Sequence, residues 1–160
     1  MFNISNNPNS TRGFTLIQIL ITVSIIIILA SISFFFIHRF QRFTALQQAQ
    51  ALLLVNSQHL EKNYQHHASF KQNSTTWIKL YSPQNQHFCV RILGNPLYHD
   101  GNSYALKAVS LDKKREPRIL KLNRHGTILL CQSSESTCEE KLPFFSGDIN
   151  VDKHCTIFNR

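Results

Sequence analysis

The sequence predicts an α+β fold in which one long N-terminal helix packs on an antiparallel sheet of about four strands. Three observations support this prediction. Residues 14–37 form an uncharged apolar run, residues 38–66 continue with apolar residues at helical spacing, and residues 67–160 contain short β-like segments separated by turn residues. We therefore expect a membrane-spanning half-helix, an amphipathic half-helix and a C-terminal β domain.

Charge is scarce in this chain and unevenly distributed along it. Of its 160 residues, 42% are hydrophobic and only 16% are charged, with 17 Lys+Arg against 9 Asp+Glu and a formal net charge of +8. A typical globular chain is about 25% charged, and no carboxylate occurs before Glu61. This composition argues against a disordered acidic chain, a collagen-like polymer and an ordinary cytosolic enzyme. It favours a small basic domain tethered to a membrane.

The apolar run 14–37 predicts a transmembrane helix. It exceeds the roughly 20 residues that a span requires, and it is longer than the apolar core of about 7 to 15 residues in a cleavable signal peptide. Loop charge leaves its orientation open, because Arg12 precedes the run whereas Arg39 and Arg42 follow it at the membrane edge.

The four cysteines indicate an oxidising compartment for the C-terminal domain. Cys89, Cys131, Cys138 and Cys155 are an even number without a close pair, which favours disulfides over a structural zinc site. Four cysteines allow three connectivities. We expect Cys131 to pair with Cys138 in a short local loop. We expect Cys89 to pair with Cys155 and so attach the tail, residues 132–160, to the sheet.

The front of the apolar run carries a recognisable motif, RGFTLIQ, at residues 12–18. It resembles the cleavage and methylation signature of type IV prepilins and pseudopilins. The resemblance implies a leader at residues 1–13, cleavage between Gly13 and Phe14 by prepilin peptidase, and methylation of the new amine on Phe14. It also implies a single-pass inner-membrane precursor with a periplasmic C-terminal domain. Such a precursor later assembles with other pilins into a pilus or pseudopilus at the cell surface.

Gln18 departs from this signature, because the family usually has Glu at this assembly position. There the carboxylate is thought to neutralise the terminal amine of a neighbouring subunit. Gln keeps the hydrogen-bonding shape but loses the charge, so a buried amine would be less well compensated. The departure favours a minor subunit, placed at the tip of a filament, over a bulk shaft subunit.

The helix should continue from residue 38 to about Tyr64, and strands should follow it. The expected apolar stripe on the helix comprises Phe43, Leu46, Ala49, Leu53, Leu60 and Tyr64. The expected strands are residues 87–93, 103–111, 117–123 and 127–131, the last two forming a hairpin around Arg124-His125-Gly126. This order matches the pilin fold that the signature implies. The stretches LEKNYQHHASF and LNRHGTILLC also look like minor pilins of the E type.

Enzyme motifs are absent from the sequence, which contains no GxSxG, P-loop, HExxH or GxGxxG. We therefore predict no catalytic residues, cofactor or metal. The histidines His59, His66 and His67 are interpreted as solvated side chains, because His66 and His67 are adjacent and point in different directions on a helix.

Basic residues gather between positions 107 and 124 and form the candidate DNA-binding set. Its members are Lys107, Lys113, Lys114, Arg115, Arg118, Lys121 and Arg124. Such a cluster can neutralise nucleic-acid phosphates without reading sequence, and some pilin-like proteins receive DNA in natural transformation. The competing interpretation is a solvated turn that opposes edge-strand aggregation. A bitopic membrane protein with a disulfide-stabilised sensor domain is the alternative from another class.

Overall fold

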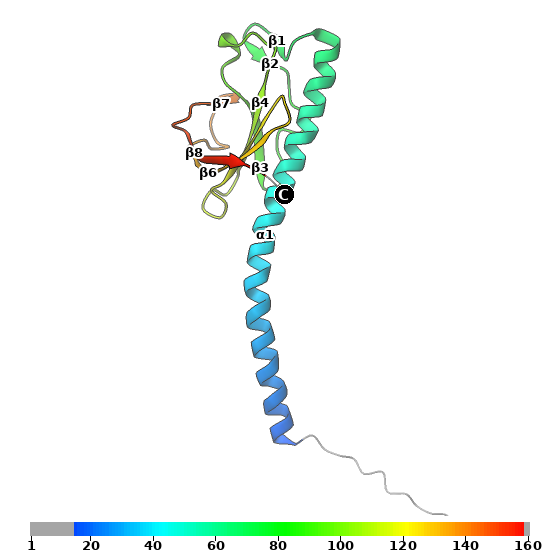
Figure 1. Cartoon of the computed structure of the whole chain (residues 1–160), viewed down its shortest axis with the longest axis vertical. Helices are drawn as coiled ribbons and strands as arrows, with labels where there is room; N and C mark the ends of the chain where they lie inside the picture. Colours follow the sequence, from blue (N-terminus) through cyan, green and yellow to red (C-terminus); the bar gives the residue numbers. More distant parts are fainter. Residues whose placement is uncertain (1–14, 159–160) are drawn as a thin grey trace, which may run out of the picture. The chain divides into compact units, whose positions relative to one another are not determined.

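The computed structural model describes residues 15–158, shown in Figure 1. Helix α1 spans Leu16–His67, and a short 3-10 helix, η1, spans Pro96–Tyr98. The strands are β1 (Lys71–Asn73), β2 (Thr76–Trp77), β3 (Phe88–Leu93), β4 (Ala105–Ser110), β5 (Ile119–Asn123), β6 (Ile128–Ser134), β7 (Phe144–Phe145) and β8 (Asp152–Ile157). The chain divides into two compact units, residues 1–40 and residues 41–160. We call the second unit the head.

The first unit holds one candidate membrane span. Leu16–Phe34 has a mean hydropathy of 2.6 and is long enough to cross a bilayer. Hydroxyl groups within it donate to carbonyls of the same helix, as Ser24 does to Leu20 and Ser31 does to Ile27, both at 2.8 Å. The hydroxyl donors of Ser24 and Ser31 are therefore satisfied within the helix itself.

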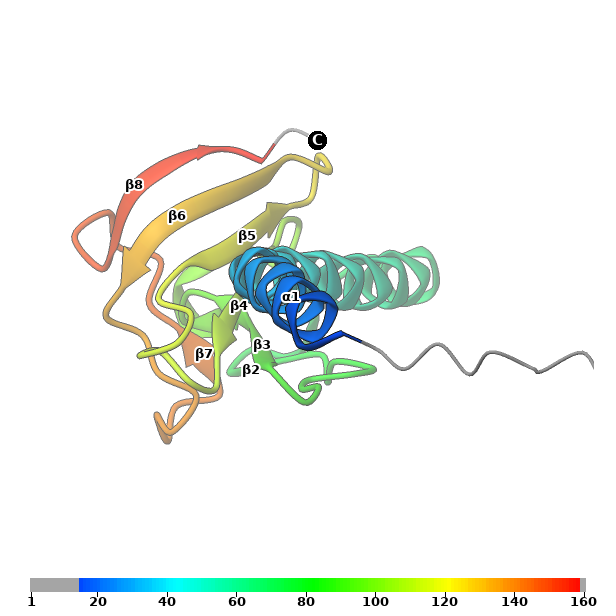
Figure 2. The same ribbon diagram turned by 90° about the horizontal axis from the view of Figure 1, so that it is seen from below.

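The head contains a two-stranded ribbon, β1–β2, and a six-stranded sheet in the order β7-β3-β4-β5-β6-β8. Strand β7 runs parallel to β3, and the other neighbours in the large sheet are antiparallel. Figure 2 shows β8, β6, β5 and β4 following one another beside the helix. The predicted α+β architecture is confirmed, with a mixed sheet of six strands where an antiparallel sheet of about four was expected.

The predicted strands correspond to β3, β4, β5 and β6. The hairpin between β5 and β6 is also confirmed, with Leu120 opposite Leu130. Gly126 occupies the turn at a φ of +80°, which a residue with a Cβ rarely adopts, and its N–H donates to the Asn123 carbonyl at 3.0 Å. Strands β7 and β8 lie in the tail, where the sequence has little periodicity and gave no strand signal.

The first core lies between the head part of α1 and one face of the sheet. Ala49, Leu53 and Leu60 of the helix are fully buried there against Leu106 and Leu120 of the sheet. These contacts explain the apolar spacing on the helix, since Leu53 follows Ala49 by four residues and Leu60 follows Leu53 by seven.

One member of the expected helix stripe does not join this core. Phe43 is 58% exposed, whereas Leu52 and Asn56 are buried although the sequence analysis did not single them out. Asn56 is accommodated because its side chain donates to the Ser82 carbonyl at 2.6 Å and accepts from the Ser82 N–H at 2.9 Å. This exchange ties the helix to the segment that leads into β3.

The second core lies on the opposite face of the sheet, under the tail. Val109, Ile119 and Phe145 are buried there together with Cys89 and Cys131. Arg91 of β3 also holds the tail, donating to the Leu142 carbonyl at 2.7 Å and to the Cys138 carbonyl at 2.8 Å. The tail is therefore a covering layer and not a loose extension.

The disulfide pairing expected from the sequence is wrong. Cys89 pairs with Cys138, and Cys131 pairs with Cys155. Cys131 and Cys155 face each other in the β6–β8 register, and β8 was not foreseen as a strand. A local Cys131–Cys138 loop is excluded because Cys138 follows the end of β6 and reaches across the sheet to β3.

Candidate functional site

The seven basic residues of the candidate DNA-binding set do not share one surface. Lys113, Lys114 and Arg115 lie in the loop between β4 and β5, whereas Arg124 follows the other end of β5. Because β5 has five residues at about 3.3 Å each, these two groups are separated by the length of the strand. Their adjacency in sequence therefore does not produce a single cluster.

Lys107 and Lys121 belong to a buried ion-pair cluster and not to the exposed surface. The Lys107 Nζ lies 2.8 Å from Asp152 Oδ1, and both side chains have no exposed area. Lys121 Nζ lies 2.5 Å from Asp152 Oδ2. Lys107 also donates to the Ser136 hydroxyl and the Ser146 carbonyl, each at 3.0 Å. The prediction that Lys107 contributes to a DNA-binding surface is wrong, because its ammonium group is enclosed by the sheet and the tail.

Asp152 is the anionic centre of this buried cluster. Burial by itself would raise the pKa of Asp152, but the contacts with Lys107, Lys121 and Ser134 outweigh it and hold that pKa below its ordinary value. Asp152 begins β8 and Lys107 lies in β4. The cluster therefore fastens the end of the tail to the middle of the sheet.

Arg118 and Arg124 are engaged by neighbouring side chains. Arg118 makes a two-pronged contact with the buried Glu116, with both nitrogen–oxygen distances at 2.6 Å. The Arg124 guanidinium lies over the Tyr64 ring, 4.5 Å from its centroid, and 3.6 Å from a Glu61 oxygen. Both cations are thus partly neutralised by carboxylates of the same head.

The β4–β5 loop presents the accessible cations of the set. Lys114 and Arg115 are exposed, and Lys113 is half-buried with its ammonium group donating to the Ser134 carbonyl. Asp112 shapes this loop, since one of its oxygens accepts the N–H groups of Lys114 at 3.1 Å and Arg115 at 3.2 Å. Of the seven candidates, Lys114 and Arg115 are the exposed ones, and Lys113 lies beside them in the same loop.

Gln18, predicted from the family resemblance to be the assembly position, has a structural role that the sequence analysis missed. Its side-chain oxygen accepts the N–H of Thr15 at 3.0 Å, while the Gln18 N–H donates to the Thr15 carbonyl at 3.0 Å. This reciprocal arrangement caps the start of α1, and either Gln or Glu can make it at this position. The spacing Thr15 to Gln18 is itself a capping signal. Gly13 and Phe14 lie outside the described residues.

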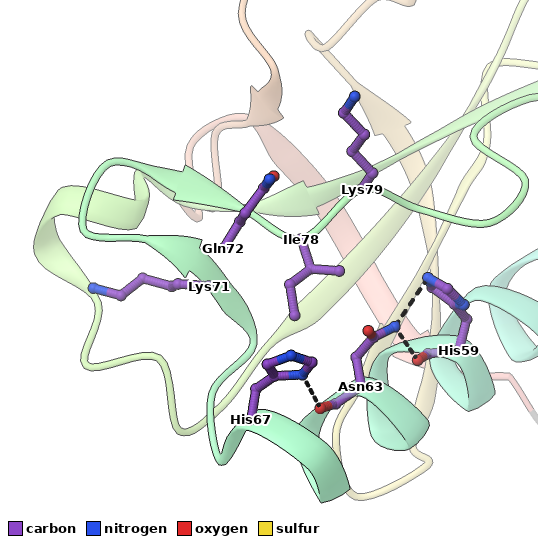
Figure 3. Close-up of a pocket in the computed structure, with 7 residues that line it drawn as sticks. All are labelled: His59, Asn63, His67, Lys71, Gln72, Ile78 and Lys79. Carbon is purple, nitrogen blue, oxygen red and sulfur yellow. Dashed lines mark hydrogen bonds between the residues drawn. The ribbon is translucent and has the colours of Figure 1, made fainter.

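His59 and His67, near the end of α1, border a pocket of about 360 Å³, shown in Figure 3. Asn63 lies between His59 and His67: its side-chain nitrogen is 3.1 Å from His59 Nε2, and its backbone carbonyl oxygen is 3.2 Å from His67 Nδ1. The Lys71 side chain extends away from this group toward η1, where it donates to the Pro96 carbonyl. Within residues 15–158, no group of three His, Cys, Asp or Glu side chains is placed to hold a metal ion.

Comparison with solved structures identifies the class of protein. The solution structure of the minor DNA-uptake pilin ComP from Neisseria subflava matches with a TM-score of 0.59 and 33% sequence identity, covering 72% of this chain and 96% of that one. The type IV pilin ComP from Neisseria meningitidis matches at 33% identity, covering 72% of this chain and 99% of that one, with a TM-score of 0.46. The non-core minor pilin PilV from Neisseria meningitidis matches at 23% identity over 66% of this chain and 96% of that one, with a TM-score of 0.43.

A search of family models and a search of curated proteins found no match. The identity and coverage of the match to ComP from Neisseria subflava nevertheless establish the family. This chain belongs to the type IV pilin family, and this match supports a minor pilin role.

Proposed function

We propose that this chain is a minor subunit of a type IV pilus that captures DNA for uptake. The observation that carries the proposal is the similarity, along nearly the whole of the matched protein, to a structure described as a minor DNA-uptake pilin. Family membership favours this function over the bitopic sensor alternative.

The exposed cations Lys114 and Arg115, with the half-buried Lys113 beside them, supply the chemistry that DNA capture requires. They are consecutive in an ordered loop, so they can follow a run of phosphates along one strand of a duplex. Lys and Arg contacts of this kind release counterions and provide affinity without selecting a sequence. The nearest carboxylates are Asp112, which binds loop N–H groups, and Glu116, which is buried against Arg118.

Charge reversal of the loop is expected to reduce DNA binding and its dependence on salt. We expect the Lys113→Glu/Lys114→Glu/Arg115→Glu head, residues 41–160, to bind duplex DNA more weakly than the wild-type head. The slope of log affinity against log salt should fall by about 2.7, which corresponds to three lost phosphate contacts. The head is a suitable fragment because both buried clusters and both disulfides lie within it. Fluorescence anisotropy at several salt concentrations measures both quantities.

A matched control reverses the charge of three exposed lysines elsewhere on the head, as Lys62→Glu/Lys141→Glu/Lys153→Glu. It changes the net charge by the same amount. An equal loss of binding in this control would show that overall charge, and not the β4–β5 loop, determines DNA binding. Absence of binding by the wild-type head at low salt would remove the DNA-capture proposal.

We also propose that the precursor is processed in the same way as other type IV prepilins. Prepilin peptidase removes residues 1–13 on the cytoplasmic side, Phe14 becomes methylated, and the head lies on the periplasmic side until assembly with other pilins. The Leu16–Phe34 segment supports an anchored precursor. The neutral side chain of Gln18 supports a place at the tip or another minor position.

Mass spectrometry of sheared filaments tests processing and abundance together. We expect a mature amino-terminal peptide that begins with N-methylated Phe14, in an amount well below that of the major subunit. The loss of a charged partner at position 18 is the reason for the low amount. An intact Met1 would contradict the processing, and an amount comparable to that of the major pilin would contradict the minor role.

A further inference from the structure

Two side chains of the β4–β5 loop are bound by neighbouring elements of the head. Lys113 donates to the carbonyl of Ser134, the last residue of β6. Arg115 Nη2 donates to Gln41 Oε1 of α1 at 2.8 Å, across 74 positions of sequence. Gln41 belongs to the head, so this contact lies within one compact unit. The loop therefore links the sheet to the helix.

Arg115 is held at both ends of the residue. Asp112 Oδ1 accepts its backbone N–H at 3.2 Å, and Gln41 accepts its guanidinium group. Asp112 also orders the backbone that follows, since its carbonyl accepts the Glu116 N–H at 2.9 Å. Both the backbone and the charged end of this exposed side chain are thus fixed before any ligand arrives.

The contact with Gln41 leaves the Arg115 guanidinium free to bind an anion. A guanidinium group has five N–H donors, and an amide oxygen that accepts one of them carries no net charge. The neighbouring Arg118 is bound differently, by two oxygens of the Glu116 carboxylate, each at 2.6 Å. Gln41 therefore orients its arginine without neutralising it, whereas Glu116 does both.

We propose that Gln41 is a positioning residue for DNA capture, whose side-chain oxygen holds the Arg115 guanidinium in an orientation that binds a DNA phosphate. The inference deepens the proposed function and rests on it for the identity of the ligand. Gln41 acts through Arg115 and contributes no charge of its own.

The physical basis is preorganisation. A free arginine side chain loses rotamer freedom when it binds a phosphate, and the Gln41 contact removes part of that freedom beforehand. Immobilising one such side chain changes affinity by about two- to tenfold. The number of phosphate contacts, and with it the slope of log affinity against log salt, stays the same because Arg115 keeps its charge.

The test is Gln41→Met in the full chain, held in uncharged detergent micelles, with fluorescence anisotropy of a labelled DNA duplex of mixed sequence. The full chain is used because Gln41 would be the terminal residue of the isolated head. Methionine has a similar length but lacks the accepting oxygen. We expect duplex affinity to fall by about two- to tenfold with an unchanged salt slope. Arg115→Gln should instead lower the slope by about 0.9.

Two further variants separate positioning from a general effect on the helix. Gln58→Met changes another exposed glutamine of α1 and should leave affinity unchanged. Gln41→Met added to Arg115→Gln should cause no further loss, because the two side chains act as one unit.

Unchanged affinity in Gln41→Met while the wild type binds would overturn the inference alone, as would a lowered salt slope or a full additional loss in the double variant. Absence of duplex binding by the wild type at low salt would remove the proposed function and this inference together.

Discussion

Asp152→Asn is expected to lower the free energy of unfolding of the head by about 3–5 kcal/mol. The substitution removes the carboxylate that pairs with both Lys107 and Lys121 and leaves the enclosed Lys107 ammonium group without its ion-pair partner. A loss of this size is a large part of the stability of a small domain, about 5–15 kcal/mol. Guanidinium unfolding of the oxidised head, followed by circular dichroism, measures it.

The effect of Asp152→Asn should depend on pH in a defined direction. Because the pKa of Asp152 is lowered in the folded head, its contribution is fully present above the pKa of the unfolded carboxyl group, about 3.9. It is lost as the pH falls through the folded-state value. The difference between wild type and variant should therefore shrink below about pH 4. Asp148→Asn, an exposed Asp of the same tail, is the matched control and should change stability little. Equal effects of the two substitutions would contradict a buried ion-pair cluster.

Cys89→Ala/Cys138→Ala is expected to destabilise the head by about 4 kcal/mol. The Cys89–Cys138 disulfide closes a separation of 49 residues, and loop entropy in the unfolded chain gives this magnitude. The second disulfide, Cys131–Cys155, closes a separation of 24 residues. Its removal by Cys131→Ala/Cys155→Ala should lower the free energy of unfolding by about 3.5 kcal/mol. Denaturant unfolding of both variants under non-reducing conditions measures the two losses.

Peptide mapping without reduction provides the control for this comparison. It should yield one peptide pair that contains Cys89 with Cys138 and another that contains Cys131 with Cys155. Recovery of a Cys131–Cys138 peptide would contradict the fold of the tail. A negligible loss of stability in both variants would show that the two cores hold the tail without covalent help.

The helix and the central strands were predictable because local patterns determine them. Apolar spacing at Leu46, Ala49 and Leu53 marks a face that the sheet covers, and the turn residues around Gly126 mark a hairpin. The sequence analysis missed β8 because its residues include only one large aliphatic side chain, Ile157. Its place depends on pairing with β6 and on the buried Asp152, both of which are long-range features.

The candidate site was predictable only in part. Consecutive cations Lys113, Lys114 and Arg115 correctly indicated an exposed basic loop. Lys107 carries the same formal charge, but its enclosure depends on Asp152, which is 45 positions away in sequence. Composition therefore identifies cations, whereas only tertiary structure separates those available to a ligand from those neutralised inside the head.

Because Gln18 caps the start of α1 with a neutral side chain, it affects how the helix moves from the bilayer into a protein assembly. An amide at this position supports the start of α1 through Thr15 without carrying an ionisable proton. A glutamate there would have to be protonated or paired each time it exchanged lipid for a protein interior. If the chain assembles as proposed, we expect the first turn of this helix to pass from bilayer to filament without any change in protonation at residue 18, so residue 18 adds no pH dependence to that step.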